Sequence, residues 1–306
     1  MSSEGLARMV RITGSTQLAA VIGWPIEHSL SPAMHNAVYD ELGLDWVYVP
    51  LAVPDEIALR RVLAAIRTLP FVGFNVTMPY KAAVLELCDE VATAAKMAGA
   101  VNTVHCTGGR LVGYNTDGRG LLESLADDAG FSPEGKRVAL LGAGGAAGAA
   151  IVALVLGRAA CVDVVARDSM RGESLFSRIE PFLKNTEVNV RTFENAQTAV
   201  READLIVNAT PMGMRVGDPS PIPASWMHSG QIVLDMVYGA GASTALLADA
   251  NAAGAVGMDG LGMLVGQGAT AIDIWNQDKD APTPRTTMRK AAEAELARRV
   301  RAGGAA

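Results

Sequence analysis

Cysteine is scarce in this sequence, and the few cysteines follow no paired spacing. Cys88, Cys106 and Cys161 lie far apart and form no CxxC motif. Disulfide frameworks and zinc knuckles need several regularly spaced cysteines, so neither is indicated. The four histidines also lack metal-ligand spacing, and we therefore expect no metal site. These features favour a protein of the reducing cytoplasm.

Long apolar runs and clusters of basic residues are missing as well. The longest apolar run, residues 146–156, contains a glycine and is too short to span a bilayer. The N-terminal segment has charge but no apolar core of the signal-peptide type, so we interpret residues 1–17 as a flexible extension. The net charge is -6, the pI is near 5.3, and the basic residues are scattered. We therefore expect no nucleic-acid partner and no membrane partner, while a local basic pocket for a small anion stays open.

What the sequence does contain is enough apolar residues to build a large core. It has 306 residues, of which 50% are hydrophobic and 19% charged. This composition is that of a globular protein, and the length favours two domains over one.

The first part of the chain alternates short apolar runs with helical patterns. Strands are expected at residues 18–23, 46–51 and 71–77, helices at 32–42, 55–69, 81–96 and 118–129, and a hairpin turn at 107–110. This alternation predicts an α/β fold with an open, mostly parallel sheet.

A second unit begins near Lys136, where an apolar strand runs into a glycine cluster. Its expected strands are residues 137–142, 161–166, 204–208 and 231–236, followed by helices at 263–275 and 286–301. Pro282 and Pro284 separate the last two helices. We expect these helices to pack back on the first unit.

A glycine loop follows the first strand of the second unit. The segment reads G-x-G-x-x-A from Gly142 to Ala147 and opens a helix rich in small residues. Gly142 suits a tight turn, and Gly144 allows backbone N–H groups to approach a pyrophosphate at the helix N-terminus. The alternative is a tight structural turn without a ligand. The loop predicts a dinucleotide site made by Gly142, Ala143, Gly144, Gly145 and Ala146.

The end of the next strand bears on the kind of dinucleotide. NAD-binding folds usually place an acid there for the ribose 2′-OH, but this sequence has Ala166. Arg167 follows, with Arg171 one helical turn later, an arrangement expected for a 2′-phosphate. Asp168 lies between them and would repel a phosphate. The pattern favours NADP as the cofactor, with NAD as the alternative. A purely structural alternative also remains, in which the two arginines only solvate a surface turn.

Four polar motifs precede the glycine loop, each at the carboxyl end of an expected strand. They are residues 23–32, 73–81, 99–103 and 113–118. Carboxyl ends of strands in open α/β sheets are where ligands bind, so these motifs predict one substrate site.

In order, the motifs HSLSP, NVTMPYK, GAVNT, GYNTDG, GAGGAA, NATPMGM, DMVY and DGLGMLVGQG resemble the shikimate dehydrogenase family, which includes shikimate and quinate dehydrogenases. The resemblance extends from about residue 18 to residue 276. It implies a substrate domain of residues 18–118 and 260–306, with a Rossmann NAD(P)-binding domain of residues 119–259 inserted between the two parts.

The resemblance also implies roles for single residues. Lys81 and Asp117 would be the catalytic pair, and Asp117 would also orient the substrate hydroxyl. Carboxylate binding is implied for Ser29 and Ser31, the rest of the substrate pocket for Thr77, Asn102, Tyr238 and Gln267, and cofactor contacts for Thr210, Met236 and Gly260. Ketone reduction needs a proton donor beside the carbonyl oxygen, and a lysine held by a carboxylate can supply the proton.

Each of these residues also has an ordinary structural interpretation. Lys81 could be a surface residue at a helix start, and Asp117 a turn former before glycine. Ser29 or Ser31 could cap the helix that Pro32 begins. Met236 could be a core residue.

The activity implied is the reversible, NADP-dependent reduction of 3-dehydroshikimate to shikimate, a step of aromatic amino-acid biosynthesis. One alternative is a related NAD-dependent enzyme acting on quinate or an aminated shikimate. Another is a dinucleotide-binding sensor without catalysis. The sequence leaves the choice between monomer and homodimer open.

Overall fold

The structure is a computed structural model that describes residues 12–183, 185–215, 217–239, 243–277 and 282–302. Residues 1–11, most of the predicted flexible extension, lie outside the described residues. At the other end of that extension, Ser15 and Thr16 donate hydrogen bonds to the Asp45 carboxylate at 2.7 and 2.6 Å. Within the described ranges, no helix is long and apolar enough to cross a membrane.

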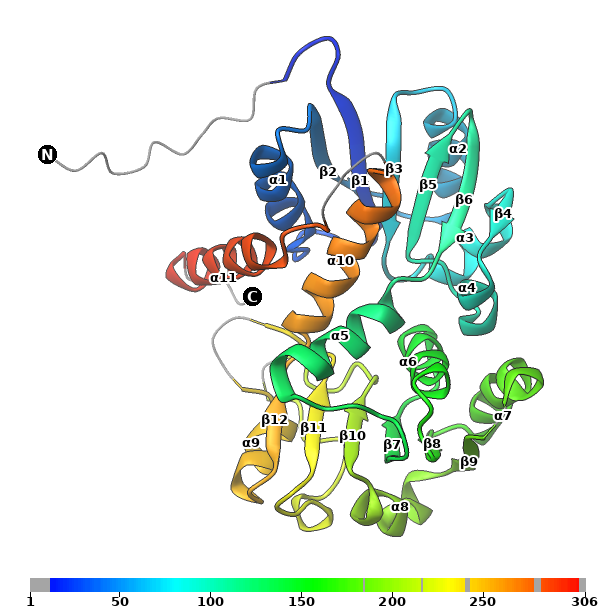
Figure 1. Cartoon of the computed structure of the whole chain (residues 1–306), viewed down its shortest axis with the longest axis vertical. Helices are drawn as coiled ribbons and strands as arrows, with labels where there is room; N and C mark the ends of the chain where they lie inside the picture. The colour runs from blue at the N-terminus through cyan, green and yellow to red at the C-terminus, as the bar shows by residue number, and fades with distance from the viewer. Residues whose placement is uncertain (1–11, 184, 216, 240–242, 278–281, 303–306) are drawn as a thin grey trace, which may run out of the picture.

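A mixed six-stranded sheet organises the first unit (Figure 1). Its strands are β1 (Gln17–Gly23), β2 (Trp46–Ala52), β3 (Phe71–Val76), β4 (Glu90–Val91), β5 (Thr103–Thr107) and β6 (Arg110–Tyr114). They lie in the order β2-β1-β3-β5-β6-β4, and only β5 runs antiparallel to its neighbours. Gly108 and Gly109, at φ 57° and 77°, form the two-residue turn between β5 and β6. The sheet and the hairpin confirm the sequence-based predictions.

The helices of this unit are α1 (Ser31–Leu42), α2 (Glu56–Ile66), α3 (Lys81–Leu87) and α4 (Thr93–Ala98). The single helix predicted over residues 81–96 is wrong, because it is divided into α3, β4 and α4. Cys88 leaves the helical conformation at φ -77° and ψ 147°, and the Asp89 carboxylate accepts hydrogen bonds from Arg67 and from the Leu111 backbone. Next to these long-range contacts, β4 pairs with β6 as a strand. The tertiary contacts therefore override the local helix propensity of this segment.

The second unit is a six-stranded sheet in which every neighbouring pair is parallel. Its strands are β7 (Arg137–Leu141), β8 (Cys161–Val165), β9 (Glu187–Arg191), β10 (Leu205–Asn208), β11 (Ile232–Asp235) and β12 (Val256–Met258). The order β12-β11-β10-β7-β8-β9 is 6-5-4-1-2-3 when strands are counted within this sheet, which is the Rossmann order. The order reverses between β7 and β10, where such sheets bind dinucleotides.

Helices cover this sheet and connect it to the first unit. They are α5 (Asp117–Ala129), α6 (Gly145–Leu156), α7 (Ser169–Ile179), α8 (Gln197–Glu202) and α9 (Ala245–Ala252). The sequence did not predict β9 or β12. β9 is a partly exposed edge strand of polar composition and β12 has only three residues, so neither has a strong apolar pattern.

The last two helices, α10 (Leu261–Trp275) and α11 (Arg285–Arg301), return to the first unit as predicted (Figure 1). Val265 and Ile272 of α10 share one buried core with Val21 of β1. Trp275 donates a hydrogen bond to the Val104 carbonyl at 2.9 Å and anchors the end of α10 on β5. In Figure 1, α5 lies between the two sheets, and α10 runs alongside the first sheet and reaches α5.

Candidate active site

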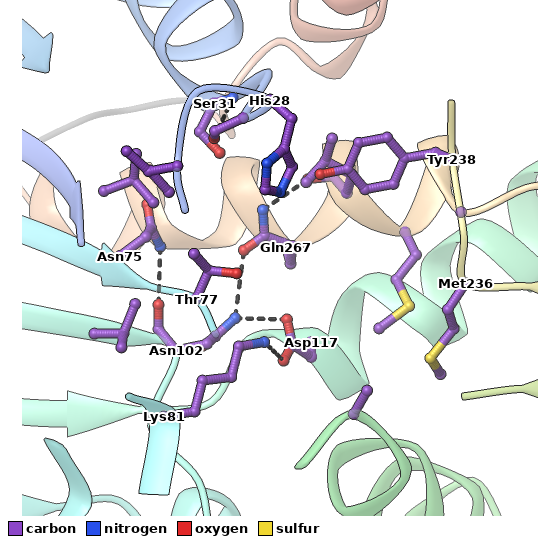
Figure 2. Close-up of a pocket in the computed structure, with 18 residues that line it drawn as sticks. His28, Ser31, Asn75, Thr77, Lys81, Asn102, Asp117, Met236, Tyr238 and Gln267 are labelled. Atoms are coloured by element: carbon purple, nitrogen blue, oxygen red, sulfur yellow. Dashed lines mark hydrogen bonds and ion pairs between the residues drawn. The ribbon is translucent and has the colours of Figure 1, made fainter. Parts of the chain in front are cut away.

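A cavity of about 190 Å³ opens where the carboxyl ends of the first sheet face the second unit (Figure 2). All the sequence-predicted catalytic and substrate residues lie in its wall, together with three predicted cofactor residues. The predicted residues that line it are Ser29, Ser31, Thr77, Lys81, Asn102, Asp117, Ala146, Met236, Tyr238, Gly260 and Gln267. Residues more than 200 positions apart in the sequence therefore meet at one site.

Lys81 and Asp117 form an ion pair in this cavity. The Lys81 Nζ atom lies 2.6 Å from Asp117 Oδ2, and the two side chains are 23% and 8% exposed. Lys81 is the first residue of α3, and Asp117 is the first residue of α5. Lys81 is thus a helix-start residue, as its structural interpretation expected, whereas Asp117 begins a helix and does not form a turn. Their side chains nevertheless meet in the cavity, where water is restricted and a charge pair is strengthened.

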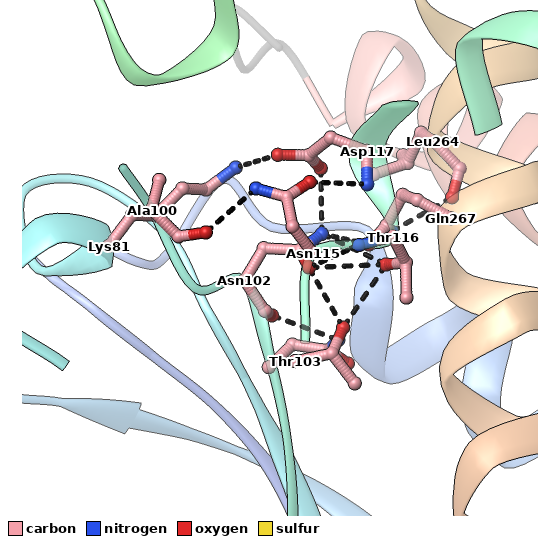
Figure 3. Close-up of polar contacts among 10 residues, drawn as sticks. Lys81, Ala100, Asn102, Thr103, Asn115, Thr116, Asp117, Leu264 and Gln267 are labelled. Atoms are coloured by element: carbon pink, nitrogen blue, oxygen red, sulfur yellow. Dashed lines mark hydrogen bonds and ion pairs between the residues drawn. The ribbon is translucent and has the colours of Figure 1, made fainter. Parts of the chain in front are cut away.

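Asn102 holds the other side of the Asp117 carboxylate (Figure 3). Its Nδ2 atom donates to Asp117 Oδ1 at 2.7 Å and lies 3.3 Å from Gln267 Oε1. The Asn102 Oδ1 atom accepts a bond from the Thr116 backbone N–H at 2.8 Å. Asp117 therefore keeps one oxygen for Lys81 and one for Asn102, which fixes the orientation of the pair.

Ser29 and Ser31 lie in the loop that enters α1. Leu30 occupies the N-cap position and makes no side-chain capping bond, so Ser31 as the N-cap is wrong. Ser31 is already inside the helix, because the loop positions Leu30 as its boundary residue. Ser29 Oγ accepts a hydrogen bond from the Ser31 N–H at 3.3 Å. Both serines line the cavity, where two hydroxyls and the nearby helix N-terminus suit an anionic group.

Tyr238 and Gln267 extend the polar wall. Burial raises the pKa of Tyr238, Arg299 opposes this shift, and the Asp117 carboxylate adds to it. The phenol therefore stays protonated at neutral pH and can donate a hydrogen bond. Gln267 Nε2 donates to the Leu264 carbonyl of α10 at 2.9 Å, which orients its amide.

The glycine loop lies at the end of β7, beside the point where the strand order reverses. Gly142 has φ +111°, and a Cβ there would lie 3.0 Å from the Ala209 carbonyl oxygen of the loop after β10. Gly144 is the N-cap of α6 and has no capping side chain, while Gly145 begins the helix. No atom of the described residues lies within 4 Å of the position that a Gly144 Cβ would take. Open space beside uncapped N–H groups fits a pyrophosphate.

Thr210 lies across the switch point from this loop. Its backbone N–H and Oγ1 both donate to Asn208 Oδ1, at 3.0 and 2.6 Å. Asn208 in turn donates to the buried Asp235 carboxylate at 2.9 Å. Desolvation raises the pKa of Asp235, and its hydrogen bonds to Thr244, Val237 and Asn208 oppose the shift. These contacts fix the loop after β10 against the end of β11.

Arg167, Asp168 and Arg171 lie at the entrance of α7, at the end of β8. Asp168 is the N-cap of α7, and its Oδ1 accepts a bond from the Met170 N–H at 3.0 Å. Its other oxygen lies 3.8 Å from Arg171 Nε. The carboxylate that complicated the cofactor prediction therefore has a structural role in the helix. Both arginines are exposed and Ala166 is buried, so no acid stands at the position typical of NAD-binding folds.

Met236 of the second unit and Gly260 at the start of α10 meet at the cavity. Met236 is partly buried and packs against a core of the second unit, so it is both a core and a cavity residue. A Cβ on Gly260 would lie 2.2 Å from the Met236 carbonyl oxygen. Glycine at position 260 therefore lets the start of α10 approach the end of β11 closely.

Two polar cavity residues were absent from the sequence-based prediction, although both lie in motifs that it singled out. His28 precedes Ser29, and Asn75 lies within β3. Asn75 accepts a hydrogen bond from the buried Tyr48 hydroxyl at 2.8 Å and lies 3.2 Å from the Asn102 carbonyl. Strand alternation could have placed Asn75 on the same face as Thr77. The loop position of His28 has no periodic signal. Val21, Ile26, Val76, Met263 and Leu264 also line the cavity.

The second unit has a Rossmann-ordered sheet, and it faces the first α/β unit across a polar cavity. These features define the chain as a two-domain, dinucleotide-binding α/β protein. The family model described as shikimate dehydrogenase substrate binding domain matches residues 21–104. The model described as shikimate / quinate 5-dehydrogenase matches residues 124–216. The chain belongs to the shikimate dehydrogenase family, as its motifs predicted.

Individual relatives match over nearly the whole chain. The shikimate dehydrogenase (NADP(+)) of Geobacter metallireducens is 44% identical over 275 residues, which are 89% of this chain and 95% of the relative. The structure of shikimate 5-dehydrogenase from Thermus thermophilus in complex with NADP(H) and shikimate is 36% identical, with TM-score 0.79, and the match covers 91% and 99% of the two chains. Quinate dehydrogenase from Corynebacterium glutamicum in complex with NAD is 30% identical, with TM-score 0.82, over 91% and 99%.

Proposed function

We propose that the chain is an NADP-dependent shikimate dehydrogenase that reversibly reduces 3-dehydroshikimate to shikimate. The observation that carries the proposal is the Lys81–Asp117 pair, 2.6 Å apart, in a polar cavity that Ala146 and Met236 of the second unit also line. This arrangement supports the proposal, because Lys81 could donate a proton to the same substrate that a hydride donor on the Rossmann-type sheet would reach. The NADP-dependent relatives support the same activity.

The residues divide between the two ends of the substrate. In Figure 2, Ser31 lies on one side of the cavity and Lys81 on the other, with Thr77 and Gln267 between them. We assign the substrate carboxylate to Ser29 and Ser31. The ring hydroxyls are assigned to Thr77, Asn102, Asp117, Tyr238 and Gln267. The reacting carbonyl then lies at Lys81.

Proton transfer at Lys81 follows from the ion pair. The bound cofactor supplies or accepts the hydride at the reacting carbon. In the direction of reduction, a Lys81 N–H bond breaks and its proton forms the new O–H bond at the carbonyl oxygen. Asp117 keeps the ammonium aimed at that oxygen, and Asn102 keeps Asp117 in place. Because Lys81 is 23% exposed, solvent can return the proton afterwards.

The cofactor residues are assigned from the geometry of the second sheet. Gly142, Ala143, Gly144, Gly145 and Ala146 would hold the pyrophosphate at the start of α6, and Thr210 would flank it. Arg167 and Arg171 would pair with the 2′-phosphate of NADP. Met236 and Gly260, which line the cavity, would border the nicotinamide. Asp168 caps α7 through one oxygen, so its presence beside the arginines is compatible with this assignment.

The domain assignment is part of the proposal. We assign residues 18–118 and 260–306 to the substrate domain and residues 119–259 to the cofactor domain. The shared core of β1, α1 and α10 supports the discontinuous first domain. Free thiols at Cys88, Cys106 and Cys161 support a location in the cytoplasm. A monomer or a homodimer fits the proposal, and light scattering distinguishes them.

A second function with support is quinate dehydrogenation with NAD, because a quinate dehydrogenase in complex with NAD shares the fold at 30% identity. An aminated shikimate would fit the same carboxylate and hydroxyl contacts. A sensor without catalysis is disfavoured by the intact Lys81–Asp117 pair.

The test is a set of initial rates with shikimate and quinate, each with NADP and with NAD. We expect shikimate with NADP to give the highest kcat/KM. Replacing Lys81 with Ala should lower kcat by about 10² to 10⁴-fold, the range for losing a general acid or base. Turnover of quinate alone would establish the second function. Near-normal rates without Lys81 would show that the reacting atoms lie elsewhere.

A further inference from the structure

The C-terminal helix reaches the loop that carries the cavity serines. Arg299, near the end of α11, donates from Nη1 to the His28 carbonyl at 2.7 Å and from Nη2 to the Ser29 carbonyl at 3.0 Å. The guanidinium is rigid and planar, so two bonds to consecutive carbonyls define the direction of the loop. A residue at the far end of the chain thus holds the backbone beside the site.

Arg299 is itself held in place. Its Nε atom lies 2.8 Å from Glu295 Oε1, and the two side chains are 17% and 18% exposed. Arg298 binds the same carboxylate, with Nε 2.7 Å from Oε2, but its side chain is 67% exposed. Among the contacts described here, Arg298 makes none with the serine loop. Two neighbouring arginines of the helix therefore pair with the same glutamate, and Arg299 is the one that contacts the loop.

The loop held by Arg299 forms the anion-binding side of the cavity. His28, Ser29 and Ser31 line the cavity, and the Ser31 N–H donates to Ser29 Oγ at 3.3 Å. Lys81 is the one Lys or Arg in the described cavity wall, and Asp117 neutralises it. Serine hydroxyls bind a carboxylate only if their directions match its oxygens.

The charge of Arg299 is also present on this side of the site. The guanidinium opposes the rise of the Tyr238 pKa that burial causes. Two arginines share one glutamate, so the cluster of Arg298, Arg299 and Glu295 carries one net positive charge. Replacing either arginine with Gln removes the same charge from this cluster, so comparing the two variants separates the loop contacts of Arg299 from the charge of the cluster.

We propose that Arg299 is a positioning residue that holds the loop of residues 28–31 so that Ser29 and Ser31 bind the carboxylate of the substrate. It acts through the loop backbone and does not touch the substrate. The inference rests on the proposed function, because it takes the ligand of the two serines to be a substrate carboxylate. It extends the site to α11, which lies outside the residues that line the cavity.

The first experiment compares Arg299→Gln with the matched control Arg298→Gln. Losing the charge-assisted bonds to the loop should raise the KM for shikimate about tenfold or more in the first variant. The kcat should fall by less than about threefold, because Lys81 and Asp117 lie at the other end of the cavity. Arg299→Lys should recover part of the loss, since an ammonium cannot span both carbonyls as a guanidinium does. Arg298→Gln should stay within about twofold of wild type.

The second experiment repeats Arg299→Gln in a Ser29→Ala, Ser31→Ala background. If Arg299 acts through the two hydroxyls, its effect on KM should shrink to less than about twofold there. An equal effect in both backgrounds would overturn the inference, because it would mean that the charge or the whole fold carries the effect. Equal KM values for the Arg299 and Arg298 variants would overturn it as well.

Controls separate this inference from protein instability and from the proposed function. The Kd for NADP alone should be unchanged, because the proposed cofactor residues lie on the second unit. If Arg299→Gln does not fold, Glu295→Gln is used in its place. It keeps the Arg299 guanidinium but removes the carboxylate that holds it, and it should raise the KM for shikimate without lowering kcat. Wild-type turnover of shikimate is measured in the same assay. Its absence would refute the proposed function, and the variants would then be compared on the acid that wild type does turn over.

Discussion

At the scale of single residues, Gly142 and Gly144 lack a side chain for two different reasons. Gly142 has φ +111° and lies against the Ala209 carbonyl, so the fold itself requires glycine. Gly144 has an ordinary extended backbone at φ -88° and ψ -168° and faces open space in the described structure. The fold would accept alanine there, which indicates that the glycine leaves room for a ligand.

Alanine substitutions should separate these two roles. Gly142→Ala should lower the free energy of unfolding by about 2 kcal/mol, the cost of a strained backbone. Gly144→Ala should change it by less than about 1 kcal/mol, because the lost entropy of the unfolded chain offsets the weaker cap. The Kd of Gly144→Ala for NADP should nevertheless rise about tenfold or more. Urea unfolding and a fluorescence titration measure the two quantities, and wild-type affinity in Gly144→Ala would place the pyrophosphate elsewhere.

At the scale of elements, α1 is anchored through a buried histidine. His35 stacks on Tyr48 with ring centroids 4.0 Å apart, and its Nδ1 lies 2.9 Å from the Ser31 carbonyl. Burial lowers the pKa of His35 from 6.5 to about 4. Its Nε2 has no partner among the described residues. The neutral ring therefore packs between α1, β2 and α10 as an aromatic core residue.

This anchor makes stability depend on pH in a defined direction. On acidification the unfolded chain binds a proton at His35 below about pH 6.5, whereas the folded chain does so only near pH 4. The neutral ring contributes fully to the free energy of unfolding above pH 6.5. This contribution, about 3 kcal/mol, is lost as the pH falls through 4. His35→Phe should remove this part of the pH dependence in urea unfolding at pH 7, 5 and 4.

A second histidine provides the control for that experiment. Hydrogen bonds to the Ser229 and Arg201 carbonyls raise the pKa of the exposed His228, so its contribution has the opposite sign. It is present at low pH and is lost as the pH rises through the folded-state pKa. His228→Gln should therefore keep the acid destabilisation that His35→Phe removes. An unchanged pH dependence in His35→Phe would mean that other groups control the acid transition.

At the scale of the whole molecule, the cavity belongs to both units. Asp117 and Lys81 approach it from the first unit, while Ala146 and Met236 approach it from the second. A ligand in the cavity contacts both units and fixes their relative position. A second ligand then binds without the cost of positioning them. Binding of substrate and cofactor should therefore be coupled, and the coupling must be reciprocal.

The coupling can be measured without turnover in a Lys81→Met variant. Calorimetric titration of NADP with saturating shikimate should give a Kd at least about fivefold lower than without it. Acetate, which has a carboxylate but no ring, should leave the Kd unchanged. An NADP affinity that is independent of shikimate would show that the two ligands bind separate, uncoupled sites.

Several parts of the site could be predicted from the sequence because their signals are local. The glycine loop that begins at Gly142 directly follows its strand, so strand and loop are one contiguous segment. The polar motifs after β3 and β6 are contiguous segments as well. Carboxyl ends of parallel strands meet at one edge, which is why Thr77 and Asp117 were expected together. The family motifs then singled out Lys81 among the six lysines of the sequence.

The parts that escaped prediction depend on contacts between distant segments. The helix predicted over residues 81–96 is interrupted because Asp89 meets Arg67 and the Leu111 backbone. Arg299 has no local pattern that links it to Ser29, which lies 270 residues earlier. The Arg299 contact exists only after α11 has packed on α1.

By itself, the sequence determined the chemical groups of this protein and the local elements that carry them, since strand, turn and helix preferences act over a few residues. It thereby determined the family, the two α/β units and the pair Lys81–Asp117. Only the tertiary structure decided how each group is held: Asp117 by Asn102, the serine loop by Arg299, and Asp168 as the cap of α7. The reason is physical, because a hydrogen bond between distant residues forms only when the folded core has brought their backbones together.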